Sequence, residues 1–141
     1  MIKTFAFLVK NPFYEKYGVE MKEHGINGGL YNGYVGFNEI LPLSYQGGAS
    51  SDFKDNKGKV LDDYIHVHGG ITFDSKFNKM RSIVPLTEIP QNWYCYRIIG
   101  FDCLHFADTE ENCPIDYIKD QTLKLKEQID KLINDKKLSN I

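Results

Sequence analysis

The sequence predicts an α+β fold, a mostly antiparallel β-sheet with a C-terminal amphipathic α-helix packed on one face. Three observations predict it. Short segments of apolar and β-branched residues occupy the first two thirds of the chain, turn-forming glycines and prolines separate them, and helical periodicity is confined to the C-terminal segment. The length of 141 residues suits one domain, so we expect a single domain over residues 1–141.

Four segments have strand character. The first alternates apolar residues at a spacing of two, the third contains a glycine pair, and the last is aromatic and β-branched throughout. They are Ile2–Val9, Tyr31–Phe37, Tyr64–Phe73 and Trp93–Phe101. Between the second and third, a polar, glycine-rich stretch at about residues 42–60 predicts a long loop. Pro85 and Pro90 indicate another loop before the last strand.

The C-terminal helix is expected over about residues 114–136, with Pro114 in its first turn. One stripe of residues at helical spacing would face the sheet: Ile118, Thr122, Leu125, Ile129 and Leu132. Favourable pairs four positions apart, such as Asp120 and Lys124, would lie on the solvent side. The same stripe is also suited to packing against a second copy of the chain, which would give a homo-oligomer.

Composition and charge exclude several classes of protein. The formal net charge is −2 and only two basic residues are arginines, which argues against a dedicated binder of duplex nucleic acid. No apolar run is long enough to cross a bilayer, and the apolar stretch near the N-terminus is too short for a signal peptide. Three cysteines without a CxxC pair argue against a disulfide framework and a cysteine-rich zinc site. We expect a cytoplasmic protein with reduced thiols.

Histidines and aspartates concentrate in two segments, HVHGGIT and GFDCLHFAD. If the third and fourth strands are neighbours, one register places His66 or His68 beside Asp102 on one face of the sheet. His105 and Asp108 would close over the strand end from a loop, and the glycines would leave room for a ligand. The expected candidate site therefore holds three imidazoles and two carboxylates: His66, His68, His105, Asp102 and Asp108.

Such a cluster suits a His–Asp general base, or a set of zinc or manganese ligands. The alternative is structural: the histidines line a solvated sheet face and the aspartates cap turns. Because Cys103 lies close to His105 in the sequence, a nucleophilic cysteine activated by a histidine is a further alternative. However, strand alternation turns Cys103 to the apolar side with Phe101, so we expect a buried structural cysteine, and neither Cys95 nor Cys113 has supporting context.

Tyrosines next to glycines suggest ligand contacts. Flat side chains with a polar end suit stacking on a nucleobase, although they suit a sheet core equally well. The residues expected to bind a small nucleotide-like ligand, in addition to the histidines and aspartates above, are Tyr31, Asn32, Tyr34, Gly69, Gly70 and Thr72.

The segments YNGYVGF, VHGGITF and GFDCLHFAD resemble a group of small proteins encoded by bacteriophages and their bacterial hosts. In that group GYV, VHGGLT and GFDCxHxGD motifs occur in this order before a C-terminal helix. The resemblance covers roughly residues 31–37, 64–73 and 93–134. This chain departs at Ala107, where the group has glycine, and the added side chain would stiffen the loop that holds Asp108.

The resemblance implies a phage or prophage protein that acts in the host cytosol, and by analogy of context one that disarms host defence. Three functions stay open. The first is binding and sequestering a nucleotide-derived immune signal, such as a cyclic dinucleotide or an ADP-ribose derivative. The second is a small hydrolase or phosphodiesterase that cleaves such a signal, either with a divalent metal as its cofactor or without a metal. The third is protein–protein inhibition of a host enzyme.

Overall fold

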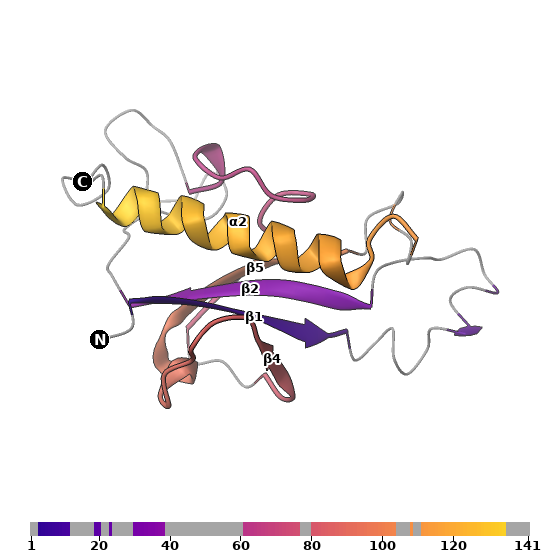
Figure 1. The fold of residues 1–141 in the computed structure, drawn as a ribbon, viewed down its shortest axis with the longest axis horizontal. Helices are drawn as coiled ribbons and strands as arrows, with labels where there is room; N and C mark the ends of the chain where they lie inside the picture. The colour runs from indigo at the N-terminus through magenta and orange to yellow at the C-terminus, as the bar shows by residue number, and fades with distance from the viewer. Residues whose placement is uncertain are drawn as a thin grey trace.

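The computed structural model describes residues 3–11, 19–20, 23, 30–38, 61–76, 80–103, 108 and 111–134. Its described part contains a five-stranded antiparallel sheet and a long helix, α2, lying across one face (Figure 1). The strands, in the spatial order β3-β5-β2-β1-β4, are β1 Thr4–Lys10, β2 Tyr31–Phe37, β3 Phe73–Ser75, β4 Ile83–Pro85 and β5 Arg97–Phe101. The predicted α+β fold with the helix on one sheet face is confirmed.

The two central strands pair over their whole length, with Phe7 opposite Tyr34. Side chains of β1 and β2 alternate between two apolar layers, and both layers are buried. A strand buried on both faces reads as a continuous apolar run rather than as an alternation with polar residues. The run from Phe5 to Val9 in β1 fits this description, whereas β2 includes Asn32 and two glycines. The predicted Tyr31–Phe37 agrees with β2 at both ends.

Helix α2 spans Ile115–Asn134 and buries the predicted stripe of five residues against β1 and β2. The helix approaches the sheet closely where Thr122 meets Gly33. A Cβ atom built on Gly33 would collide with the Thr122 hydroxyl and with the Phe101 ring. Thr122 directs this hydroxyl back to the Ile118 carbonyl at 2.6 Å, so its polar group is satisfied inside the core.

The opposite face of the sheet is covered by the chain between β3 and β5. Trp93, Met80 and Ile89 from this segment pack against an aromatic layer that includes Phe7 and Tyr34. Phe7 stacks on Tyr34 with ring centroids 5.4 Å apart. The molecule thus has three layers, with α2 and the 61–71 segment on one side of the sheet (Figure 1).

The structure corrects three sequence predictions. The expected strand Tyr64–Phe73 is an extended loop that enters the sheet only at Phe73, where β3 begins. The expected strand Trp93–Phe101 starts instead with a 3₁₀ turn over Trp93–Cys95. Residues 83–85, expected as loop, form the edge strand β4. The long loop predicted at about 42–60 lies outside the described residues.

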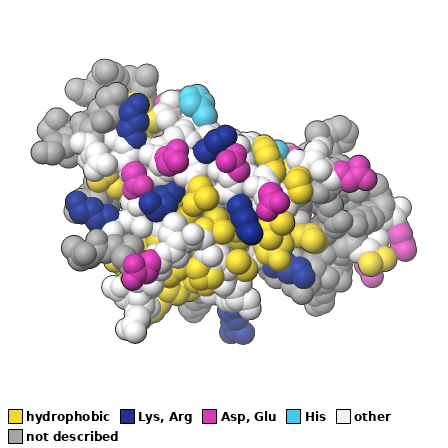
Figure 2. All heavy atoms as spheres, in the orientation of Figure 1, with side chains coloured by type: hydrophobic (Ala, Val, Ile, Leu, Met, Phe, Trp, Pro, Cys, Tyr) yellow, Lys and Arg dark blue, Asp and Glu magenta, His cyan; other side chains and the backbone are white. Residues whose placement is uncertain are grey.

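The exposed face of α2 carries charges of both signs. Figure 2 shows lysine and acidic side chains interspersed over this face rather than gathered into a basic patch. The predicted pair Asp120–Lys124 forms, with 3.0 Å between the carboxylate oxygen and the ammonium nitrogen. Within the described ranges, no helix combines the length and the hydropathy of a membrane span.

Candidate metal centre

His68 projects from a tight turn over residues 67–70. The Gly70 amide donates a hydrogen bond of 2.9 Å to the Val67 carbonyl, which closes the turn. Gly69 and Gly70 both have positive φ angles, 68° and 80°, in the left-handed region that favours glycine. The glycine pair therefore serves the backbone geometry that presents His68, and the Ile71 amide after it is held by the Asp62 carboxylate at 3.1 Å.

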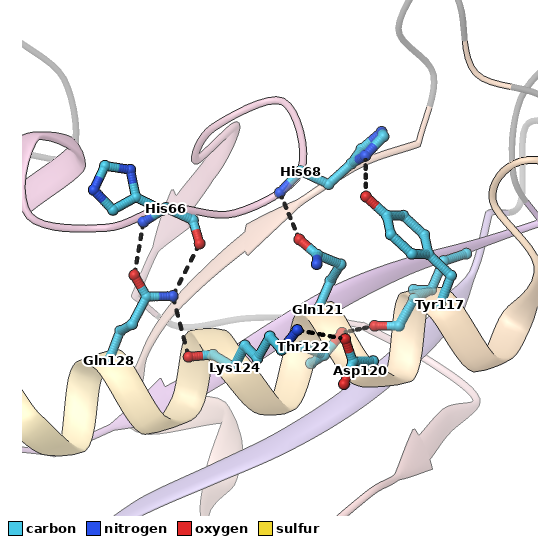
Figure 3. Close-up of polar contacts among 9 residues, drawn as sticks. His66, His68, Tyr117, Asp120, Gln121, Thr122, Lys124 and Gln128 are labelled. Carbon is cyan, nitrogen blue, oxygen red and sulfur yellow. Dashed lines mark hydrogen bonds and ion pairs between the residues drawn. The ribbon is translucent and has the colours of Figure 1, made fainter.

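Two glutamines of α2 hold the segment that carries both histidines (Figure 3). Gln128 accepts a hydrogen bond from the His66 amide at 2.7 Å and donates one to the His66 carbonyl at 2.9 Å. Gln121, two helical turns earlier, accepts one from the His68 amide at 3.0 Å. The helix thus supplies side-chain hydrogen-bond partners to the backbone of this segment, which lies outside the sheet.

Four potential ligand atoms converge beside the first turn of α2. The His68 Nε2 atom lies 2.8 Å from an Asp108 carboxylate oxygen and 3.9 Å from the Cys113 sulfur. With the Cys103 sulfur added, all four atoms lie within 4.8 Å of one another. Cys103 follows β5 and Cys113 precedes α2, so the centre joins the end of a strand, the start of the helix, the His68 turn and Asp108.

The two separations measured from His68 are close to those around a tetrahedral zinc ion. Zn–N and Zn–O bonds of about 2.0 Å and Zn–S bonds of about 2.3 Å place nitrogen and oxygen ligands about 3.3 Å apart, and nitrogen and sulfur about 3.5 Å apart. A zinc ion would therefore widen the contact between His68 and Asp108 by about 0.5 Å and shorten that between His68 and Cys113 by about 0.4 Å. Both changes are small side-chain adjustments.

Burial makes the acidic ligand groups costly to ionise without a cation. Cys103, Cys113 and Asp108 are each at most 4% exposed. Burial raises the pKa of the Cys103 thiol far above its ordinary value, and the neighbouring Cys113 and Asp108 raise it further. A divalent cation reverses this effect, because it deprotonates coordinating thiols and neutralises the carboxylate.

The geometry argues against a catalytic Cys–His–Asp triad. In a triad the imidazole uses one nitrogen for the nucleophile and the other for the carboxylate. Here Cys113 and Asp108 both approach Nε2 of His68, while Nδ1 is 2.8 Å from the Tyr117 hydroxyl. Convergence of several donor atoms on one point, one of them the imidazole Nε2, is the pattern expected of metal ligands.

Of the four residues of the expected catalytic cluster that the structure describes, two meet here, His68 and Asp108. His66 is exposed, and its ring lies apart from that of His68 (Figure 3). The strand that was to set His66 or His68 beside Asp102 does not form. Asp102 instead follows Phe101, which faces α2, so alternation places Asp102 toward the other side of the sheet. On that side burial raises the pKa of Tyr34, and the Asp102 charge raises it further. His105 lies outside the described residues.

The residues expected to bind a nucleotide-like ligand are divided between the two sides of the sheet. Tyr31 packs against the core on the helix side of the sheet. Tyr34 lies in the opposite layer, where the side-chain nitrogen Nδ2 of Asn32 donates a hydrogen bond of 3.5 Å to its hydroxyl. Thr72 is exposed, and its amide donates to the Gly100 carbonyl. With Gly69 and Gly70 serving the His68 turn, this set does not surround one common space.

Sequence reasoning missed both cysteines of the centre. Cys103 was correctly expected to be buried, but not as a ligand, and Cys113 was given no role. The usable signal is the spacing, since Cys103 and Cys113 lie ten positions apart with Asp108 midway, between a strand and a helix. Tyr117 carries no signal until the fold is known.

Comparison with protein-family models, curated proteins and solved structures finds no match to this chain. The resemblance to the phage-encoded group therefore stays a prediction.

Proposed function

We propose that this chain is a zinc-binding protein whose metal centre is formed by His68, Cys103, Asp108 and Cys113. The observation that carries the proposal is the convergence of two sulfurs, one imidazole nitrogen and one carboxylate oxygen within 4.8 Å. Zinc fits because it combines thiolate, imidazole and carboxylate ligands in tetrahedral geometry. Two thiolates and one carboxylate give a total charge of −3, so bound Zn²⁺ leaves a centre of charge −1.

The proposed role of the ion is structural. A site in which the protein supplies all four ligands is typical of structural zinc, whereas catalytic zinc keeps a position for water or substrate. The ligands come from elements that share no strand pairing with one another, namely the His68 turn, the chain after β5 and the approach to α2. Zinc would cross-link them at one end of the sheet.

The first experiment measures metal content and ligand geometry in one series. The chain, purified without a histidine tag, is unfolded in chelator, refolded with Zn²⁺ or Co²⁺, and freed of excess metal. We expect one zinc per chain by mass spectrometry of the metal. In the cobalt form we expect a thiolate-to-Co²⁺ charge-transfer band together with the intense visible bands of a tetrahedral site.

The chain supplies matched controls for the ligands. His68→Ala and Cys113→Ser are expected to lose the metal, whereas His66→Ala and Cys95→Ser retain it, because His66 and Cys95 are exposed and outside the centre. Wild-type protein that takes up neither ion would overturn the proposal. So would control variants that lose the metal as completely as the ligand variants.

Asp108 decides between a structural and a hydrolytic centre. If Asp108 is the fourth ligand, Asp108→Asn weakens zinc binding and alters the cobalt spectrum. If Asp108 is instead a general base beside a metal-bound water, this variant keeps a tetrahedral cobalt spectrum and full zinc content. The second result would overturn the structural role and favour the hydrolase predicted as an alternative.

The nucleotide hypothesis is tested by incubating the zinc-loaded protein with cyclic dinucleotides and ADP-ribose derivatives, then analysing the small molecules before and after heat denaturation. Intact recovery only after denaturation would identify sequestration, and a new product would identify cleavage. Neither outcome is needed for zinc binding, so the two proposals stand or fall separately.

A further inference from the structure

We infer that Tyr117 is a positioning residue for the metal centre: its hydroxyl fixes the His68 ring so that Nε2 faces the other three ligands. The inference deepens the zinc proposal and rests on it. The Tyr117 oxygen lies 2.8 Å from Nδ1 of His68, on the side of the ring away from Asp108 and Cys113. The two rings meet edge to face, with centroids 5.5 Å apart and planes at 85°.

The arrangement follows from the helix itself. Tyr117 and Gln121 lie four positions apart in α2, so their side chains share one side of the helix, and Cys113 stands two positions before the helix begins. From this side α2 supplies the Tyr117 hydroxyl to the His68 ring and the Gln121 side-chain oxygen to the His68 backbone amide. One helix therefore holds both the ring and the backbone of His68 (Figure 3), and the chain that enters this helix carries the Cys113 sulfur.

The chemistry of the contact matches that of other imidazole ligands. A neutral imidazole that binds a metal through Nε2 carries its proton on Nδ1, and metal-bound histidines donate this proton to an oxygen. The Tyr117 oxygen is in position to accept it. A hydroxyl can also donate, so Tyr117 still has a bonding mode when Nε2 carries the proton and donates to Asp108. A carboxylate at position 117 would accept only.

The test is Tyr117→Phe, which removes one oxygen and keeps the ring, with Tyr94→Phe at an exposed tyrosine as the matched control. Zinc affinity, measured by competition with a chelating indicator, should fall on the order of 10–100-fold in Tyr117→Phe and stay unchanged in the control. Circular dichroism of both variants establishes whether each is folded.

A spectroscopic readout separates positioning from general packing. In the zinc-loaded wild type, nitrogen-15 NMR should show His68 bound through Nε2, with an Nδ1–H proton protected from exchange with water. In Tyr117→Phe this protection should disappear. A folded variant with wild-type affinity and a protected Nδ1–H overturns the inference alone, whereas a wild-type chain that binds no zinc overturns the proposed function.

Discussion

Removing zinc from the loaded protein is expected to destabilise it strongly, because the ligands are brought together only by the native fold. His68 is separated by 40 positions from Asp108 and by 45 from Cys113. The unfolded chain must close these loops before it can bind zinc with the full ligand set, so zinc favours the native state. At free zinc a thousandfold above the dissociation constant, the stabilisation is about 4.1 kcal/mol.

This free energy converts into a shift of the melting temperature. Unfolding entropy of about 2.1 cal/mol/K per residue, over 141 residues, amounts to about 0.3 kcal/mol/K. Zinc should therefore raise the melting temperature by about 14 °C relative to protein in excess chelator. The assay is thermal unfolding followed by near-ultraviolet circular dichroism, in buffers of fixed free zinc.

Variants show whether the shift comes from the proposed centre. Cys95→Ser should keep the full shift, whereas Cys113→Ser should show almost none. A wild-type shift no larger than that of Cys113→Ser would refute the reasoning. An equal loss in Cys95→Ser would mean that zinc binds through the exposed thiol, and would refute it as well.

Three further predictions concern the scaffold around the centre. Gly33→Ala should lower the free energy of unfolding by roughly 1–3 kcal/mol, measured in urea, because its Cβ has no room beneath α2; a neutral effect would contradict this packing. Gln128→Ala should cost roughly 1–2 kcal/mol through the lost hydrogen bonds to the His66 backbone, and equal loss in the exposed Glu127→Ala would count against it. Iodoacetamide should alkylate Cys95 first in the native protein, since the other two thiols are buried; simultaneous labelling of all three would disagree.

Local patterns were sufficient to predict the elements that form the core. The stripe Ile118, Thr122, Leu125, Ile129 and Leu132 is buried as its spacing predicts, because a helix on a sheet has one apolar side. The wrong strand prediction for residues 64–72 also came from a local pattern, but the structure of this segment depends on residues far along the chain. Apolar and β-branched residues suggested a strand there, yet the partner of this backbone is a pair of helix glutamines, which no sequence period reveals.

The centre could be predicted only in part for the same reason. His68 and Asp108 were expected to lie near each other, whereas Cys113 was given no role, because no local pattern shows that the chain entering α2 passes beside His68. Which side of the sheet receives Asp102 depends on where β5 ends, and a shift of one residue exchanges the two sides. The chemistry of such a site is therefore decided by strand register and helix placement.

The two edges of the sheet bear on how this protein would assemble. Edge strands β3 and β4 each span three residues, and β4 ends at Pro85, which has no amide hydrogen to donate. Addition of a strand from a second copy at either edge would gain few main-chain hydrogen bonds, so both edges resist sheet-to-sheet polymerisation. The homo-oligomer suggested by the sequence would have to form through side-chain surfaces rather than through a shared, continuous sheet.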